Sequence, residues 1–143
     1  MDGGIRGALA RAFGDPLARA GYADIVGPYG GGLVTENGVA AAFADALARW
    51  GGADECLYTT VTLPAGREAS LEGCLAVGLR FAGKAFPGHQ SLVAVHYDGR
   101  PEIHIVTCAV SFLDGADIGE RMLPRDEQER LIKDLLARMP GAP

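Results

Sequence analysis

QSLVAVHYDGRPEIHIVTCAVSF, residues 90–112, joins two apolar runs through a short segment that contains glycine and proline. Both runs are rich in β-branched and aromatic residues, which favours strands. The sequence therefore predicts a strand over residues 90–98, a turn over residues 99–101 and a second strand over residues 102–112. Two strands joined by so short a connection must be antiparallel.

Apolar residues at helical spacing predict helices on both sides of this hairpin. The expected helices are residues 4–13, a short helix opening at Pro16, residues 39–50 behind a cap at Asn37, residues 71–86 behind a cap at Ser70, and a last helix opening at Pro124. Residues 56–63 are predicted to form a further strand, and Ile25 with Val26 a brief one. We therefore expect one compact α+β domain, residues 1–143, with an antiparallel or mixed sheet and helices packed mainly on one face.

The composition is that of a globular protein, with 48% hydrophobic and 22% charged residues. The formal net charge of −5 argues mildly against a broad nucleic-acid surface, because such surfaces are usually basic. No apolar run is long enough to span a bilayer, and residues 1–13 lack the long apolar segment of a secretory signal, so a cytoplasmic location is expected. The three cysteines form no CxxC pair, and we expect all three to be buried and reduced.

Two of the three histidines and two carboxylates lie close together in the hairpin. If the turn is centred on Arg100, His96 lies opposite His104 and Asp98 lies opposite Glu102. All four side chains then project from one face of the sheet, and opposed Cβ atoms are roughly 5 Å apart. That spacing suits a divalent ion. It equally suits a solvated sheet end, where the carboxylates are ordinary turn residues and the histidines are satisfied by hydrogen bonds.

A longer stretch, residues 62–115, resembles the core of conjugative relaxases, the mobilisation nucleases of the His-hydrophobic-His endonuclease superfamily. The resemblance covers somewhat over a third of the chain. It rests on four ordered phrases, which are Leu63-Pro64-Ala65-Gly66, Phe81 to Phe86 with His89, Val95-His96-Tyr97-Asp98, and Glu102-Ile103-His104-Ile105-Val106.

The resemblance implies a relaxase-like fold and metal-dependent nicking and strand transfer on single-stranded DNA. In that family a tyrosine attacks a phosphodiester while a histidine-bound divalent metal polarises the phosphate. His96 and His104 match the first and last metal ligands, and Glu102 stands where the middle histidine is usual. A carboxylate binds Mg²⁺ or Mn²⁺ well, so the expected metal set is His96, Glu102 and His104, with Asp98 beside them.

The expected nucleophile is Tyr22 or Tyr29, which lie on the N-terminal side of the matching core. Each is equally readable as a half-buried packing residue. Tyr58 and Tyr97 fall inside predicted strands and are expected to be structural. His89 is read either as a phosphate contact or proton donor, or as a solvated connector between helix and strand.

Two other functions remain open at this point. The first is a degenerate relaxase-like module that has lost nicking and acts as an accessory or inhibitor through DNA or through a protein partner of a nucleic-acid machine. The second is an unrelated metal-binding hydrolase that uses Asp98 or Glu102 as a general base. None of the three functions involves a membrane.

Overall fold

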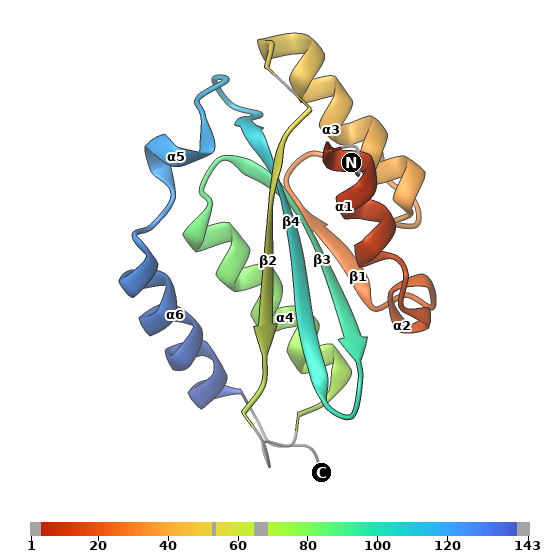
Figure 1. Cartoon of the computed structure of the whole chain (residues 1–143), viewed down its shortest axis with the longest axis vertical. Helices are drawn as coiled ribbons and strands as arrows, with labels where there is room; N and C mark the ends of the chain where they lie inside the picture. The colour runs from red at the N-terminus through yellow and green to blue at the C-terminus, as the bar shows by residue number, and fades with distance from the viewer. Residues whose placement is uncertain (1–3, 53, 65–68, 140–143) are drawn as a thin grey trace.

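The computed structural model describes residues 4–52, 54–64 and 69–139. Within these residues, six helices and four strands follow one another (Figure 1). In order they are α1 (Gly4–Ala12), α2 (Pro16–Arg19), β1 (Ala23–Val26), α3 (Glu36–Trp50), β2 (Cys56–Thr62), α4 (Leu71–Ala85), β3 (His89–Tyr97), β4 (Pro101–Ser111), α5 (Ile118–Arg121) and α6 (Arg125–Arg138). Ala65 and Gly66, part of one phrase of the relaxase resemblance, lie outside the described residues.

The four strands form a single antiparallel sheet in the order β1-β3-β4-β2. The hairpin of β3 and β4 occupies the centre, and β1 and β2 are the two edges. The prediction of an α+β fold built on an antiparallel sheet is confirmed.

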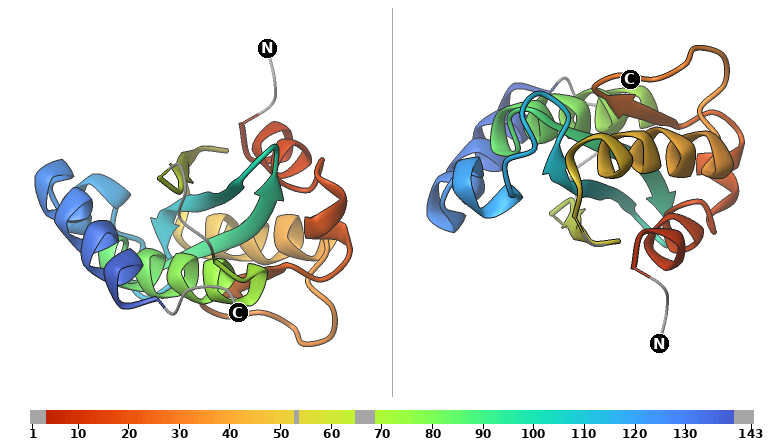
Figure 2. Two further views of the ribbon diagram at one scale, coloured as in Figure 1. Left: turned by 90° about the horizontal axis from the view of Figure 1, so that it is seen from below. Right: turned by 90° about the horizontal axis from the view of Figure 1, so that it is seen from above.

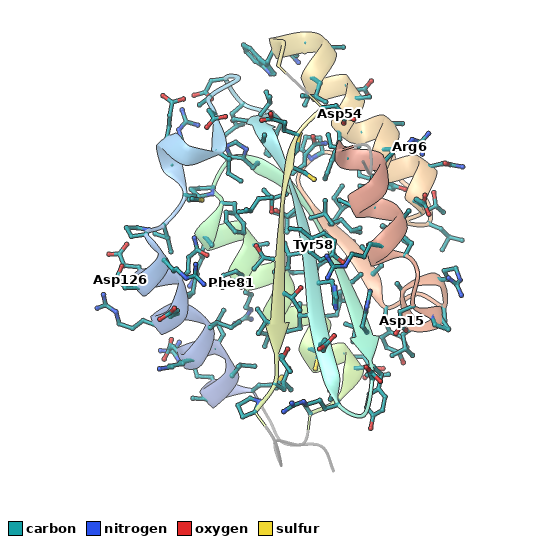
Figure 3. The ribbon with its side chains drawn as sticks, in the orientation of Figure 1. Arg6, Asp15, Asp54, Tyr58, Phe81 and Asp126 are labelled. Atoms are coloured by element: carbon teal, nitrogen blue, oxygen red, sulfur yellow. The ribbon has the colours of Figure 1, made fainter. Side chains whose placement is uncertain are left out.

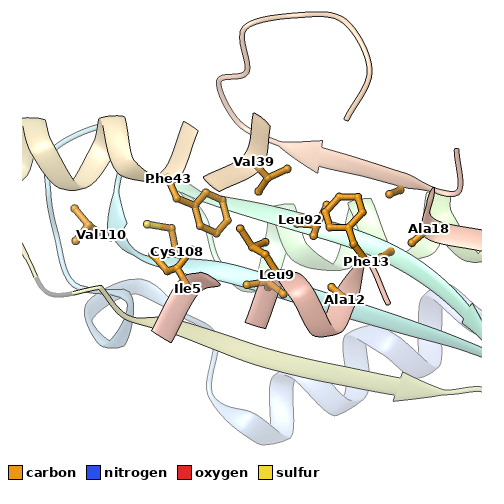
Figure 4. Packing of buried hydrophobic residues seen from close by; sticks show 13 residues of the cluster. Ile5, Leu9, Ala12, Phe13, Ala18, Val39, Phe43, Leu92, Cys108 and Val110 are labelled. Atoms are coloured by element: carbon orange, nitrogen blue, oxygen red, sulfur yellow. The ribbon is translucent and has the colours of Figure 1, made fainter. Parts of the chain in front are cut away.

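Helices cover both faces of the sheet, not mainly one face as expected. Even-numbered strand residues such as Leu92 and Val106 pack with α1 and α3 (Figure 4). Odd-numbered residues such as Val93 and Ile105 pack with α4 and α6. Figure 2 shows α1 and α4 on opposite sides of the strands. The physical reason is that β3 and β4 are buried along almost their whole length, so both of their faces require a cover.

The helix boundaries follow local capping signals. Ser70 caps α4 as predicted, since its hydroxyl accepts a hydrogen bond from the Gly73 N–H at 3.0 Å. The cap of α3 is Thr35, not Asn37: the Thr35 hydroxyl accepts from the Gly38 N–H at 3.0 Å. Asn37 lies in the first turn of α3, where its side chain accepts a hydrogen bond from Arg6.

The hairpin register differs from the prediction by two residues. The loop is Asp98-Gly99-Arg100, centred on Gly99, whose φ of +77° is the left-handed conformation that glycine adopts readily. His96 therefore lies opposite Glu102, and His104 lies opposite Ala94. A shift of two preserves which face each side chain occupies, so the predicted shared face survives while the predicted opposed pairs do not.

The cysteine prediction holds for two residues of three. Cys74 and Cys108 are buried, and Cys56 at the start of β2 is only half-buried. All three are free thiols.

Candidate functional site

The hairpin end of the even-numbered face carries a connected group of polar side chains. Tyr58 comes from β2, His96 from β3, and Glu102 and His104 from β4. Arg11, in the last turn of α1, lies over this group, with its guanidinium carbon 4.4 Å from the centre of the Tyr58 ring. Figure 3 labels Tyr58 on β2.

A chain of two hydrogen bonds links a phenol, an imidazole and a carboxylate. The Tyr58 hydroxyl lies 2.7 Å from Nδ1 of His104, and Nε2 of His104 lies 3.1 Å from Oε1 of Glu102. A carboxylate only accepts hydrogen bonds, so Nε2 carries the proton. In a neutral imidazole Nδ1 is then the acceptor, and the Tyr58 hydroxyl donates to it.

Burial keeps this imidazole neutral. His104 is 6% exposed, and the loss of water lowers its pKa below the ordinary histidine value. The hydrogen bond that His104 donates to Glu102 raises the pKa and is outweighed, while electrostatic interactions with His96 and Arg11 add to the lowering. A neutral His104 is available to accept a proton from Tyr58.

Burial also raises the pKa of Tyr58 above its ordinary value. The Arg11 cation lowers the phenol pKa and the Glu102 carboxylate raises it, each by less than burial does. The phenol therefore stays protonated near neutral pH and gives up its proton only to a base that it already contacts.

His96 holds the group against α1. Its ring stacks on His104 with centroids 3.6 Å apart and an angle of 16° between the planes. Its Nε2 lies 2.7 Å from the carbonyl oxygen of Ala12, one of the last carbonyls of α1. A helix end has carbonyl groups without intrahelical partners, and this one is satisfied by the histidine.

Three of the four residues predicted to bind a metal, His96, Glu102 and His104, lie in contact, and Asp98 lies apart from them. Asp98 lies in the hairpin loop, where its main chain closes the turn, and it does not face Glu102. Both nitrogens of His104 and one of His96 already contact protein groups. Stacked rings also direct their in-plane lone pairs side by side and not toward one point. Within residues 4–52, 54–64 and 69–139, no group of three His, Cys, Asp or Glu side chains is placed to hold a metal ion.

Neither tyrosine predicted as a nucleophile lies at the histidines. Tyr22 packs with the cluster on the opposite, odd-numbered face, and its hydroxyl donates to Glu72. Tyr29 lies ahead of α3, where its hydroxyl donates to the Leu33 carbonyl. Tyr22 and Tyr29 were chosen for their place in the sequence ahead of the matching core. Their positions in the fold are set by contacts with Glu72 and Leu33.

His89 is buried, so it is neither a surface phosphate contact nor a solvated connector. Its ring is 1% exposed, and its Nδ1 lies 2.8 Å from the Cys108 carbonyl. Its Nε2 has no hydrogen-bond partner among the described residues.

Tyr58 belongs to this site, although the sequence predicted only a structural role for it. Strand β2 pairs with β4 so that Thr60 lies opposite His104, which makes Tyr58 a diagonal neighbour of His104. The residues themselves carry no local signal for this pairing. The alternation along residues 56–62 showed that Tyr58 and Thr60 share a face, and only the β2–β4 register places that face beside His104.

Comparison of the chain with models of known families, with curated proteins and with solved structures found no match. None of the helices in the described part of the chain is long and apolar enough to cross a membrane.

Proposed function

We propose that this chain is a relaxase-like domain that cleaves single-stranded DNA through a covalent tyrosine–phosphate intermediate, with Tyr58 as the nucleophile. The observation that carries the proposal is the hydrogen-bonded chain of Tyr58, His104 and Glu102. Nucleophile, base and orienting carboxylate in contact are the arrangement that activates a hydroxyl. The sequence resemblance of residues 62–115 supplies the choice of a phosphodiester as substrate.

Each group has a role in the proposed step. The Tyr58 oxygen attacks phosphorus while its proton passes to Nδ1 of His104. Glu102 accepts the hydrogen bond from Nε2–H and stabilises the imidazolium that forms. The bond from phosphorus to the 3′ oxygen breaks, and that oxygen takes a proton from water. The products are a 5′-phosphotyrosine and a free 3′ hydroxyl.

Arg11 supplies positive charge at the rim of the site. Its exposed guanidinium stacks on the Tyr58 ring, so it is within reach of a phosphate that approaches the phenol. Guanidinium groups stabilise the charge that develops on a transferring phosphoryl group. A local cation also answers the objection raised by the overall charge of −5, since only the rim of the site must be basic.

Adduct formation on a denaturing gel tests the proposal. The protein is mixed with a randomised pool of labelled single-stranded oligonucleotides, with and without Mg²⁺ or Mn²⁺. We expect a protein–DNA adduct with wild type, with Tyr97→Phe and with the double variant Tyr22→Phe, Tyr29→Phe, and none with Tyr58→Phe. Tyr97 serves as a control because it is exposed and lies on β3 of the same sheet. An adduct that persists in Tyr58→Phe contradicts the role of this residue.

A second candidate is a relaxase-like module that binds without nicking. It is favoured by the satisfied state of the histidines, whose ring nitrogens already contact Ala12, Tyr58 and Glu102. The same oligonucleotide pool separates the two candidates. Binding measured by fluorescence anisotropy without any adduct supports the module and rejects the nickase.

A further inference from the structure

Strand β2 leaves one side of its main chain without a partner. The N–H of Leu63 donates to Pro101, and the carbonyl of Glu55 accepts from Ala109, so the odd-numbered residues direct their main-chain groups toward β4. In an antiparallel ladder the alternate residues direct theirs outward. Those residues are Cys56, Tyr58, Thr60 and Thr62. No described residue pairs with these outward groups.

The edge lacks the features that usually prevent strands from pairing. Exposed edges are commonly protected by charged side chains, proline, bulges or short length. The sequence of β2, CLYTTVT, contains no charge and no proline, and its seven residues pair with β4 without a bulge. The opposite edge, β1, is four residues long and carries Asp24.

A groove of about 770 Å³ runs beside this edge. One wall is residues 57–61 of β2. The other side is formed by Gly119, residues 122–124 and the first turns of α6, which carry Arg125 and Glu129, and Phe81 of α4 also lines the groove. Figure 1 shows β2 at the border of the sheet with α6 alongside. The groove therefore lies along the same strand whose outward main-chain groups have no partner among the described residues.

We propose that a second copy of this chain occupies the groove, and that two β2 strands pair antiparallel about a two-fold axis at Thr59. This register matches Cys56 with Thr62 of the other copy and Tyr58 with Thr60, so every outward-pointing residue finds an outward-pointing partner. In a two-fold interface a charged strand would face its own charge, and β2 carries none. A chain with a net charge of −5 thus presents an uncharged, self-complementary edge.

The pairing extends the sheet across both copies. A two-fold axis perpendicular to the sheet keeps the even-numbered faces on one side. Both Tyr58 side chains then lie on a single continuous face, each close to Thr60 of the other copy. The inference does not depend on the proposed nicking activity, because it is drawn from the edge of β2 and the groove beside it.

Engineered cysteines test the register directly. Thr59 would face Thr59 of the other copy as a non-hydrogen-bonded pair, with Cα atoms about 4.5 Å apart, a separation that a disulfide can span. Thr60 would be displaced from its own copy by two residues, roughly 7–8 Å or more, which is too far. Both changes are made in a Cys56→Ser background, because Cys56 is only half-buried. Under mild oxidation we expect a covalent dimer from Thr59→Cys and a clear deficit from Thr60→Cys.

Proline at the edge provides the second measurement. Thr60→Pro removes an outward N–H and leaves the bonds to β4 intact, so the fold is retained. We expect wild type to sediment as a dimer at micromolar concentration and Thr60→Pro to weaken the dimer roughly tenfold or more, with two donors lost per dimer. Circular dichroism checks that the variant is folded. A monomeric wild type, equal cross-linking by both cysteines, or a folded Thr60→Pro variant that dimerises as wild type does each overturn the proposal.

Discussion

His104 makes the stability of this protein depend on pH, and His104→Gln tests the reasoning behind the candidate site. In the folded chain burial lowers the pKa of His104, whereas in the unfolded chain the ring titrates near the ordinary value of about 6.5. As pH falls through that value, His104 binds a proton in the unfolded state but not yet in the folded state. The free energy of unfolding therefore falls as pH falls from about 6.5 to the folded pKa, and is constant below it.

The magnitude follows from one proton. A difference of one bound proton between the two states changes the free energy of unfolding by about 1.4 kcal/mol per pH unit. Wild type should lose stability at up to this rate below about pH 6.5, relative to His104→Gln. At pH 7.5 the variant is itself less stable, by roughly 1–3 kcal/mol, because Tyr58 and Glu102 lose the group that pairs them.

Urea unfolding between about pH 5 and 7.5 measures the effect. The difference between wild type and His104→Gln isolates this residue from the other titrating groups. Glu102→Gln provides a second comparison: it removes the contact that raises the His104 pKa, so the loss of stability should extend to lower pH. Parallel curves for wild type and His104→Gln refute the depressed pKa. A wild type that gains relative stability on acidification shows that the Glu102 contact outweighs burial.

Two further predictions concern the scaffold. Thr35→Ala should cost about 1 kcal/mol of unfolding free energy through loss of the α3 cap, and Asn37→Ala should cost less, as chemical denaturation can show. In α4, Gly78→Ala places a methyl group 2.5 Å from a Val93 methyl and should destabilise by roughly 1–3 kcal/mol, whereas Gly83→Ala is unobstructed and should stabilise by about 0.5–1 kcal/mol. The reverse order for either pair contradicts the packing described above.

The elements were predictable because their signals are local. A hydroxyl at Ser70 and a proline after Asp15 mark helix starts within one turn of the chain, and the structure has both. The prediction named Asn37 as the cap of α3, and threonine caps helices almost as well as asparagine. The hydrogen bond from Gly38 decides in favour of Thr35.

Coverage of both sheet faces also had a signal in the sequence. Residues 92–95 and 103–110 are almost continuously apolar, a pattern typical of strands buried on two faces. The polar residues at the hairpin end favoured the opposite interpretation, because polar and apolar residues alternate there as in a sheet that is covered on one face only. The candidate site lies at this polar end of the hairpin, where the His96 ring contacts the Ala12 carbonyl at the end of α1.

The site itself depends on two facts that no local pattern contains. One is the conformation of Gly99, which sets the hairpin register and separates Asp98 from Glu102. The other is the pairing of β2 with β4, which joins Tyr58 to His104 across 46 positions of sequence. The predicted face of each hairpin side chain was nevertheless correct, because a shift of two residues leaves side chains on the same face. The tyrosine proposed as nucleophile is not one of the two predicted, because its position depends on the pairing of β2 with β4.

The two proposals meet in β2 and are nevertheless separable. The side chain of Tyr58 points to His104, whereas its main chain points to the free edge. Tyr58→Phe removes the nucleophile and leaves every main-chain group of the edge, so the variant should lose the DNA adduct and keep its dimeric mass. Thr60→Pro alters the edge and leaves the Tyr58–His104–Glu102 chain, so the variant should dimerise more weakly, by the factor given above, and still form the adduct. If a folded Thr60→Pro variant loses both the dimer and the DNA adduct, nicking depends on the dimer, and the two proposals are not independent.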